Sequence, residues 1–144
     1  MKFGYHNHAV EFEKRYPDPA AANNTEGAGG PRARVREIVW YDYMVENTDP
    51  SKVFFEMDVY WVVMGKRAPV ELFKKFPGRF TVLHLKDQKE LGESGMVGFD
   101  AIFKYVGLSG AKYMIVEIEW YDFPPVESVK FSLDYLNNAP FVKF

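Results

Sequence analysis

The chain contains no cysteine, no long basic run and no long apolar stretch, and each absence removes a class of protein. Without cysteine it has no disulfides and no thiolate site. A net charge of −2 without a basic cluster argues against nucleic acid or an anionic membrane as a partner. We recognise no membrane span and no signal peptide, because Met1-Lys2-Phe3 leads directly into an expected strand. A soluble cytoplasmic protein is therefore expected.

What the chain does contain is enough apolar material for one core. It has 144 residues, of which 47% are hydrophobic and 17% aromatic, and this length suits one domain over residues 1–144. Residues 15–33 differ from the rest, because they are rich in Pro, Ala, Asn and Gly and nearly free of large apolar side chains. We expect this segment to form a flexible surface excursion.

Short apolar runs alternate four times with stretches of helical spacing, the pattern of βα units in a parallel sheet. Helices are expected where apolar residues recur about every 3.6 positions, with Pro69 in one first turn and Gly107, Gly110 and Pro140 at helix ends. The expected strands cover 2–8, 53–58, 80–86 and 112–118, and the expected helices cover 35–45, 69–76, 99–106 and 126–136.

Each expected strand carries two polar residues, two positions apart, at its carboxyl end. Neighbours two apart on a strand share a face, and parallel α/β folds assemble their sites at the carboxyl ends of strands. We therefore expect one mouth to be lined by four polar pairs: His6 and His8, Glu56 and Asp58, His84 and Lys86, and Glu117 and Glu119.

Five motifs, in their order and spacing, resemble the sugar phosphate isomerase/epimerase family of xylose isomerase-like TIM barrels, which is related to inosose dehydratases and endonuclease IV. The resemblance covers nearly the whole chain apart from the excursion, and it implies an α/β fold with only the second half of a barrel, strands five to eight. The motifs are Gly4-Tyr5-His6-Asn7-His8 with Glu11-Phe12, Glu46-Asn47-Thr48-Asp49-Pro50, Phe55-Glu56-Met57-Asp58-Val59-Tyr60-Trp61, Leu83-His84-Leu85-Lys86-Asp87 and Val116-Glu117.

A half barrel leaves strand edges and apolar surface open. A complete (β/α)₈ barrel usually needs roughly 200 residues or more, so we expect a homo-oligomer in which a second copy covers the open half. The alternative is a fragment whose first barrel half, and any export signal, lie in a missing amino-terminal region. The expected ligand is a small carbohydrate.

The resemblance implies a divalent metal at the mouth, with Asp58, His84 and Glu117 at the ligand positions of strands six, seven and eight. His6 stands where the family usually has a glutamate on strand five. Imidazole mixed with carboxylate suits Mn²⁺, Zn²⁺, Co²⁺ or Fe²⁺, and suits Mg²⁺ less well as histidines are added. In the alternative interpretation, Asp58 and His84 only anchor loops and the histidines His6 and His8 are ordinary core residues.

The same resemblance suggests roles in proton transfer and substrate binding. Glu117 serves as ligand and base, with Glu56 as a further catalytic carboxylate and Lys86 as a group that stabilises an oxyanion. Each assignment has a structural alternative. Lys86 and Asp87 could form an ion pair that caps a loop, and Trp61 could be a packing residue. The substrate-binding candidates are His8, Glu11, Trp61, Asp87 and Glu119, of which His8 and Glu11 are also reserve metal ligands.

The implied function is a metal-dependent isomerase or epimerase that moves a proton of a sugar, sugar phosphate or keto-sugar through an enediolate. One alternative is a dehydratase or lyase of a polyol, similar to inosose dehydratases. The other is a catalytically silent half barrel. An endonuclease is least favoured, because the three histidines here are too few for the three-metal cluster of endonuclease IV and no basic groove is evident.

Overall fold

The computed structural model describes residues 2–15 and 37–143. The excursion predicted at 15–33 lies outside the described residues, apart from Arg15, which belongs to a short strand, β2 (Lys14–Arg15).

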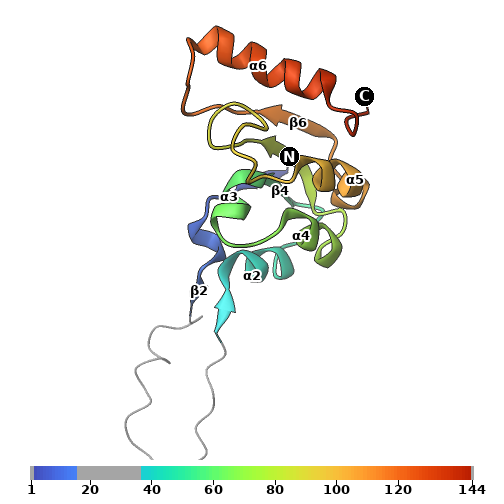
Figure 1. The fold of residues 1–144 in the computed structure, drawn as a ribbon. Helices are drawn as coiled ribbons and strands as arrows, with labels where there is room; N and C mark the ends of the chain where they lie inside the picture. The colour runs from blue at the N-terminus through green and yellow to red at the C-terminus, as the bar shows by residue number, and fades with distance from the viewer. Residues whose placement is uncertain (1, 16–36, 144) are drawn as a thin grey trace, which may run out of the picture.

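Four parallel strands form the central sheet (Figure 1). They are β1 (Phe3–His6), β4 (Val53–Asp58), β5 (Phe80–Leu85) and β6 (Tyr113–Val116), and they lie side by side in this order. Each strand therefore pairs with the next one along the main sheet, and every pairing is parallel. This progressive winding is that of a (β/α) barrel opened after four units, so the predicted fold class is confirmed, with the first and last strands shorter than expected.

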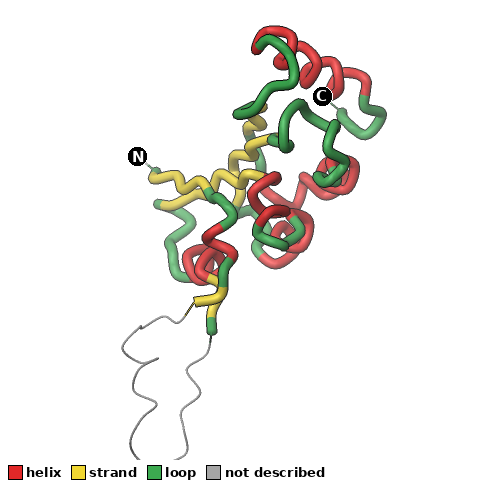
Figure 2. The backbone as a smooth tube through the Cα atoms, turned by 60° about the vertical axis from the view of Figure 1, so that its left-hand side comes forward, coloured by secondary structure: helices red, strands yellow, loops and turns green. Residues whose placement is uncertain are grey.

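Helices lie on one side of the sheet and cover its apolar residues (Figure 2). The helices α4 (Pro69–Lys75) and α5 (Phe99–Ser109) pack against each other. Between them and the strands lies one core of fully or nearly fully buried side chains, which includes Phe55, Met57, Leu72, Phe73, Phe80, Leu83, Phe99 and Ile102. Burying each such side chain contributes about 1.5–3 kcal/mol, which fixes the strand ends relative to one another.

The helix predicted at 35–45 is wrong at its start. Ile38 and Val39 form the strand β3 (Ile38–Val39), which pairs antiparallel with β2, and the helix α2 (Trp40–Glu46) begins only afterwards. Two consecutive β-branched residues favour a strand when a partner strand is available. The sequence pattern does not reveal that partner, because Lys14 and Arg15 are distant in the chain and fully polar.

The helix α3 (Val59–Met64) was not predicted, although it follows β4 directly. Asp58 begins it, since its Oδ1 accepts a hydrogen bond from the backbone N–H of Trp61 at 2.9 Å. Such an N-cap stabilises a helix by about 0.5–2 kcal/mol. The strand-end aspartate therefore has a structural function in addition to any chemistry. A single 3₁₀ turn, η1 (Val10–Phe12), occupies the loop after β1.

The apolar face predicted for the last helix comprises Val126, Val129, Leu133 and Leu136, and of these only Leu136, at 6% exposure, lies in the core. In α6 (Pro125–Asn138), Val126, Val129 and Leu133 are 83%, 55% and 52% exposed. The helix instead turns Ser128 and Ser132 inward, where they hydrogen bond to the loop after β5. A hollow of about 520 Å³ lies between α6, α5 and β6. The serine hydrogen bonds and the packing of Tyr135 and Leu136 against the core therefore hold α6.

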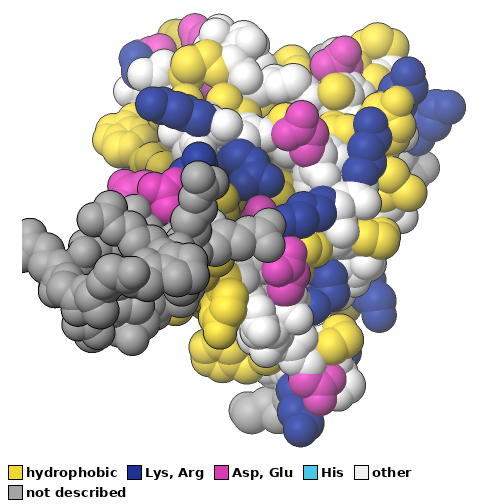
Figure 3. Space-filling view, turned by 90° about the horizontal axis from the view of Figure 1, so that it is seen from below, with side chains coloured by type: hydrophobic (Ala, Val, Ile, Leu, Met, Phe, Trp, Pro, Cys, Tyr) yellow, Lys and Arg dark blue, Asp and Glu magenta, His cyan; other side chains and the backbone are white. Residues whose placement is uncertain are grey.

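The two edges of the sheet are also exposed. All of β6 and the first part of β1 face solvent, and Phe3 and Tyr113 are each 67% exposed. Of the two glycines expected to end α5, Gly107 lies within the helix, whereas Gly110 ends it after Ser109 with a left-handed φ of 82°. None of the described helices is long and apolar enough to cross a membrane. On the face seen in Figure 3, lysine and arginine side chains are mixed with acidic and apolar ones.

Candidate functional site

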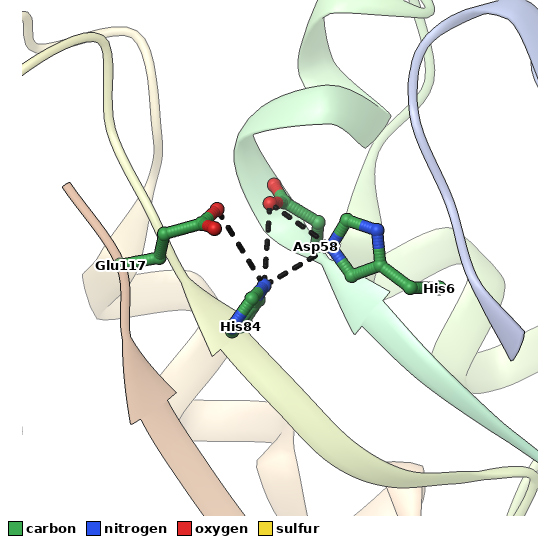
Figure 4. A group of neighbouring side chains, drawn as sticks. All are labelled: His6, Asp58, His84 and Glu117. Atoms are coloured by element: carbon green, nitrogen blue, oxygen red, sulfur yellow. Dashed lines mark hydrogen bonds and ion pairs between the residues drawn. The ribbon is translucent and has the colours of Figure 1, made fainter. Parts of the chain in front are cut away.

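Four side chains from four strand ends converge at the carboxyl edge of the sheet (Figure 4). They are His6 at the end of β1, Asp58 at the end of β4, His84 in β5 and Glu117 directly after β6. One ligand atom from each lies within 4.8 Å of all the others. The alternation of side chains along parallel strands produces this convergence, and the structure brings together the same four residues that the sequence analysis named.

Asp58 lies at the centre of this cluster and is fully buried. Its Oδ1 caps α3, whereas its Oδ2 has no hydrogen-bond partner among the described residues. That oxygen lies 3.5 Å from His6 Nε2 and 3.8 Å from His84 Nδ1. Leaving a buried carboxylate oxygen unpaired costs free energy, and a cation would remove this cost.

The two imidazoles face each other across the cluster. His6 Nε2 and His84 Nδ1 are 3.0 Å apart, and His84 Nδ1 lies 3.6 Å from Glu117 Oε2. The Asp58 carboxylate, 3.5 Å from Nε2, raises the pKa of His6 above its ordinary value, with burial acting in the opposite direction. Two imidazoles and two carboxylates form a donor set suited to mid-row divalent metals. The chemistry of the residues therefore fits the implied metal.

Asn7 supports the cluster without belonging to it. Its side chain is fully buried, its amide Nδ2 donates to the backbone carbonyl of Asp58 at 3.3 Å, and its Oδ1 accepts from the backbone N–H of Asp58 at 3.2 Å. The sequence analysis gave Asn7 no function. The available signal was an amide between two strand-end histidines, which strand alternation turns away from the mouth and into the protein.

Lys86 is buried beside Glu117 at the edge of the cluster. Its Nζ lies 3.0 Å from Glu119 Oε2 and 3.8 Å from Glu117 Oε2. The same ammonium lies 5.7 Å from the ring centre of Tyr60 and 5.1 Å from that of Trp120. The alternative ion pair between Lys86 and Asp87 is not formed. A buried cation next to a solvent-accessible carboxylate is an arrangement that can stabilise negative charge on a ligand.

Asp87 is buried, and its carboxylate is hydrogen-bonded within its own loop. It accepts hydrogen bonds from the backbone N–H groups of Gln88 and Gly92, and from the hydroxyl of Ser94. This side chain therefore shapes the loop between β5 and α5. Its contact with substrate stays a prediction.

Glu11 is likewise satisfied within the protein. Its carboxylate accepts from the Tyr5 hydroxyl at 2.9 Å and from the backbone N–H of His8 at 3.0 Å, and it does not join the converging group. The side chain of His8 is exposed, with its ring centre 5.0 Å from that of His6. Glu56 lies on the other side of the cluster, with its Oε1 3.6 Å from His84 Nε2.

Two tryptophans stand beside the cluster. Trp61 lies in α3, and its ring centre is 5.3 Å from that of His8 and 6.4 Å from that of Trp120, which is 49% exposed. The two indoles meet edge to face, at an angle of 73°. Trp120 was not among the predicted site residues, because its position after a strand end is equally consistent with a residue that merely covers the mouth.

No family model matches the chain, and no curated protein does. Among solved structures, the chain is similar to two crystal structures from Parabacteroides distasonis, each described as a sugar phosphate isomerase/epimerase. One is 37% identical, with a TM-score of 0.80 over 99% of this chain. The other is 43% identical, with a TM-score of 0.76 over 98%. The chain spans 47% of each, about half of their length.

Proposed function

Because the chain belongs to the sugar phosphate isomerase/epimerase family, we propose that it is a divalent-metal-dependent isomerase or epimerase acting on a sugar, a sugar phosphate or a keto-sugar. One observation carries this proposal more than any other. The ligand atoms of His6, Asp58, His84 and Glu117 meet within 4.8 Å, and the buried Oδ2 of Asp58 has no hydrogen-bond donor among the described residues.

The metal would be held by those four side chains. A divalent ion bound there supplies a Lewis acid that polarises a carbonyl or hydroxyl oxygen of the sugar. Mn²⁺, Zn²⁺ and Co²⁺ suit two imidazoles better than Mg²⁺ does.

Proton transfer is assigned to Glu117. Its side chain is 33% exposed, so it reaches the mouth and can take the proton from the carbon beside the substrate carbonyl. Delivering that proton to the former carbonyl carbon, while the hydroxyl proton moves to the former carbonyl oxygen, gives isomerisation. Epimerisation instead needs a second acid to deliver another proton to the opposite face of the same carbon, and Glu56 is the candidate. The Lys86 ammonium, held by Glu119, faces the negative oxygen of the enediolate.

A dehydratase of a polyol is the second candidate reaction. The same base can remove a proton next to a carbonyl, after which a hydroxyl on the adjacent carbon leaves as water. The third candidate is a silent half barrel that binds a sugar without reaction. The three candidates differ in their products: an isomeric sugar, a sugar that has lost water, or no product.

We also propose that a second copy covers the open edges. The outer edges of β1 and β6 pair with no other strand among the described residues, and both strands expose aromatic side chains. Unpaired edges of this kind favour association with another chain. Light scattering at micromolar concentration is expected to give the mass of a dimer or larger, whereas a monodisperse monomer contradicts this part of the proposal.

The reaction is tested by incubating the Mn²⁺-loaded chain with a panel of ketoses and their phosphates in D₂O. Magnetic resonance is expected to show deuterium entering the carbon beside the carbonyl. Glu117→Gln is expected to lower the rate by about 10²–10⁴-fold, whereas Glu71→Gln, on the exposed surface of α4, leaves it unchanged.

A product lighter by one water indicates the dehydratase. If the chain holds metal and yet gives neither exchange nor loss of water with any sugar, the proposed isomerase is contradicted in favour of the silent half barrel.

A further inference from the structure

The two loops that follow β5 and β6 bring an excess of acid to the mouth. Residues 86–98 and 117–124 together contain six carboxylates and two lysines, Lys86 and Lys89. In TIM barrels, the loops after the seventh and eighth strands frequently form the phosphate-binding site. The family resemblance makes β5 and β6 those two strands, so the charge of these loops bears directly on whether a phosphate group can bind.

Both lysines are already engaged by carboxylates. Lys86 is fully buried and pairs with Glu119 at 3.0 Å, and Lys89 pairs closely with Asp122. Neither lysine of these two described loops lies outside an ion pair. A dianionic phosphate would have to compete with carboxylates for either cation.

The remaining carboxylates make the environment more negative. Glu90, Glu93 and Asp122 place carboxylate oxygens within 4.8 Å of one another. Glu90 is 3% exposed, and its Oε2 has no hydrogen-bond partner in the described part of the chain. Burial, followed by the charges of Asp122 and Glu90, raises the pKa of Glu93. Like charges placed side by side on binding cost several kcal/mol, so a dianionic phosphate is disfavoured here.

The mouth instead offers aromatic surface next to the cluster. The backbone N–H of Trp61 donates to Asp58, and the ring of Trp120 lies over Lys86, which also contacts Glu117. The indole of Trp61 also contacts the rings of His8 and Trp120, so both indoles lie beside the converging site. Aromatic faces with a few polar groups are the usual lining of small-molecule sites, and they suit the C–H face of a neutral sugar.

We infer that the substrate is an unphosphorylated sugar held against Trp61 and Trp120, and that the acidic loops after β5 and β6 exclude phosphate esters. This inference rests on the proposed function, since it names the substrate class of the same site.

Tryptophan fluorescence tests the inference directly. The chain has three tryptophans, so the variant Trp40→Phe leaves emission from the two indoles of the site alone. The Zn²⁺-loaded variant is titrated with fructose, tagatose, psicose and xylulose, and with the monophosphate ester of each.

At least one free ketose is expected to bind about tenfold or more tightly than its own ester, and inorganic phosphate is expected not to compete. Trp120→Leu is expected to weaken binding of the free ketose by about tenfold, the effect of about 1.4 kcal/mol. Asp122→Asn releases Lys89 and is expected to strengthen binding of the esters at least severalfold while leaving the free ketose unaffected.

Esters that bind as tightly as the free ketoses, or a panel in which no ketose binds, overturn the inference. Fluorescence reports binding and deuterium exchange reports proton transfer, so the two proposals fail separately. Free ketoses that bind without proton exchange contradict the isomerase and leave the substrate class standing. Proton exchange that occurs only with the phosphate esters supports the isomerase and contradicts the inferred substrate class.

Discussion

The side-chain amide of Asn7 forms two hydrogen bonds with the backbone of Asp58, one to its carbonyl at 3.3 Å and one from its N–H at 3.2 Å. The two residues come from neighbouring strand ends, and both are fully buried. A residue that offers no atom to the cluster therefore fixes the position of its central carboxylate. Supporting residues of this kind tune metal sites almost as strongly as the ligands do.

Asn7→Ala is expected to weaken metal binding by about 10–100-fold and to lower the free energy of unfolding by about 1–3 kcal/mol, because it leaves buried backbone groups unpaired. Metal titration and urea unfolding measure the two effects. Asn138→Ala is the control, since that amide donates only to the exposed backbone of α6. Unchanged metal affinity in Asn7→Ala shows that the amide does not position Asp58.

As pH is lowered, metal affinity is expected to begin to decline at a higher pH than it would with a histidine of ordinary pKa. The adjacent Asp58 carboxylate raises the pKa of His6, so in the metal-free chain the imidazolium persists to a higher pH than usual. A metal binds only the neutral ring, and its affinity therefore declines as pH falls through that raised value. The same shift contributes folding stability in full below the unfolded-state pKa, about 6.5, and this contribution is lost as pH rises through the folded-state pKa.

Zn²⁺ competition titrations between about pH 8 and pH 6 test this expectation, with His6→Asn as the comparison. The variant is expected to bind more weakly at every pH but with a shallower pH dependence. Equal pH dependence in the two proteins contradicts the assignment of His6 as a ligand.

Gly110→Ala is expected to destabilise the chain more than Gly95→Ala. Both glycines have positive φ, 82° and 66°, so both variants carry strain of roughly 1–2 kcal/mol. A Cβ at Gly110 would also lie 2.8 Å from the Cα of Gly78, whereas a Cβ at Gly95 would meet nothing within 4 Å. Urea unfolding compares the two variants. Equal losses of stability would mean that the backbone at Gly78 shifts without cost to accommodate the added Cβ.

Lys86→Met is expected to slow proton exchange by about 10²–10³-fold, the effect of removing a charge-stabilising group, with little change in KM. Breaking the pair also leaves Glu119 without its partner, and this lowers stability. The double variant Lys86→Met/Glu119→Gln is the control, because it restores stability without restoring the rate. Recovery of the rate in the double variant would identify Lys86 as a purely structural residue.

Where the sequence analysis succeeded, two local rules and the family resemblance were sufficient. Strand alternation and the carboxyl-end rule placed four polar pairs on one edge, because parallel strands bring their ends together, and the resemblance selected His6, Asp58, His84 and Glu117 among them. The start of α2 was missed because the partner strand of Ile38 and Val39 is remote in sequence. A short helix such as α3 leaves little periodicity to detect, although Asp58 marks its N-cap.

Tertiary contacts explain the other errors. Periodicity predicted that Val126, Val129, Leu133 and Leu136 would face the core, but of these only Leu136 does so. Ser128 and Ser132 also face inward, because Glu90 and the backbone of Leu91 bind their hydroxyls. Asn7 and Trp120 were missed for a related reason, since each acquires its position from partners across the sheet.

The metal content of the gel-filtered chain, measured by elemental mass spectrometry, tests the central claim most directly. The wild type and Glu71→Gln are expected to carry about one divalent ion per chain. His84→Ala and Asp58→Asn are expected to lose it while keeping their circular dichroism spectra, because asparagine at position 58 can still accept from the N–H of Trp61 and cap α3. A metal-free wild type, or variants that retain the metal, would contradict the assignment of these residues as a metal site.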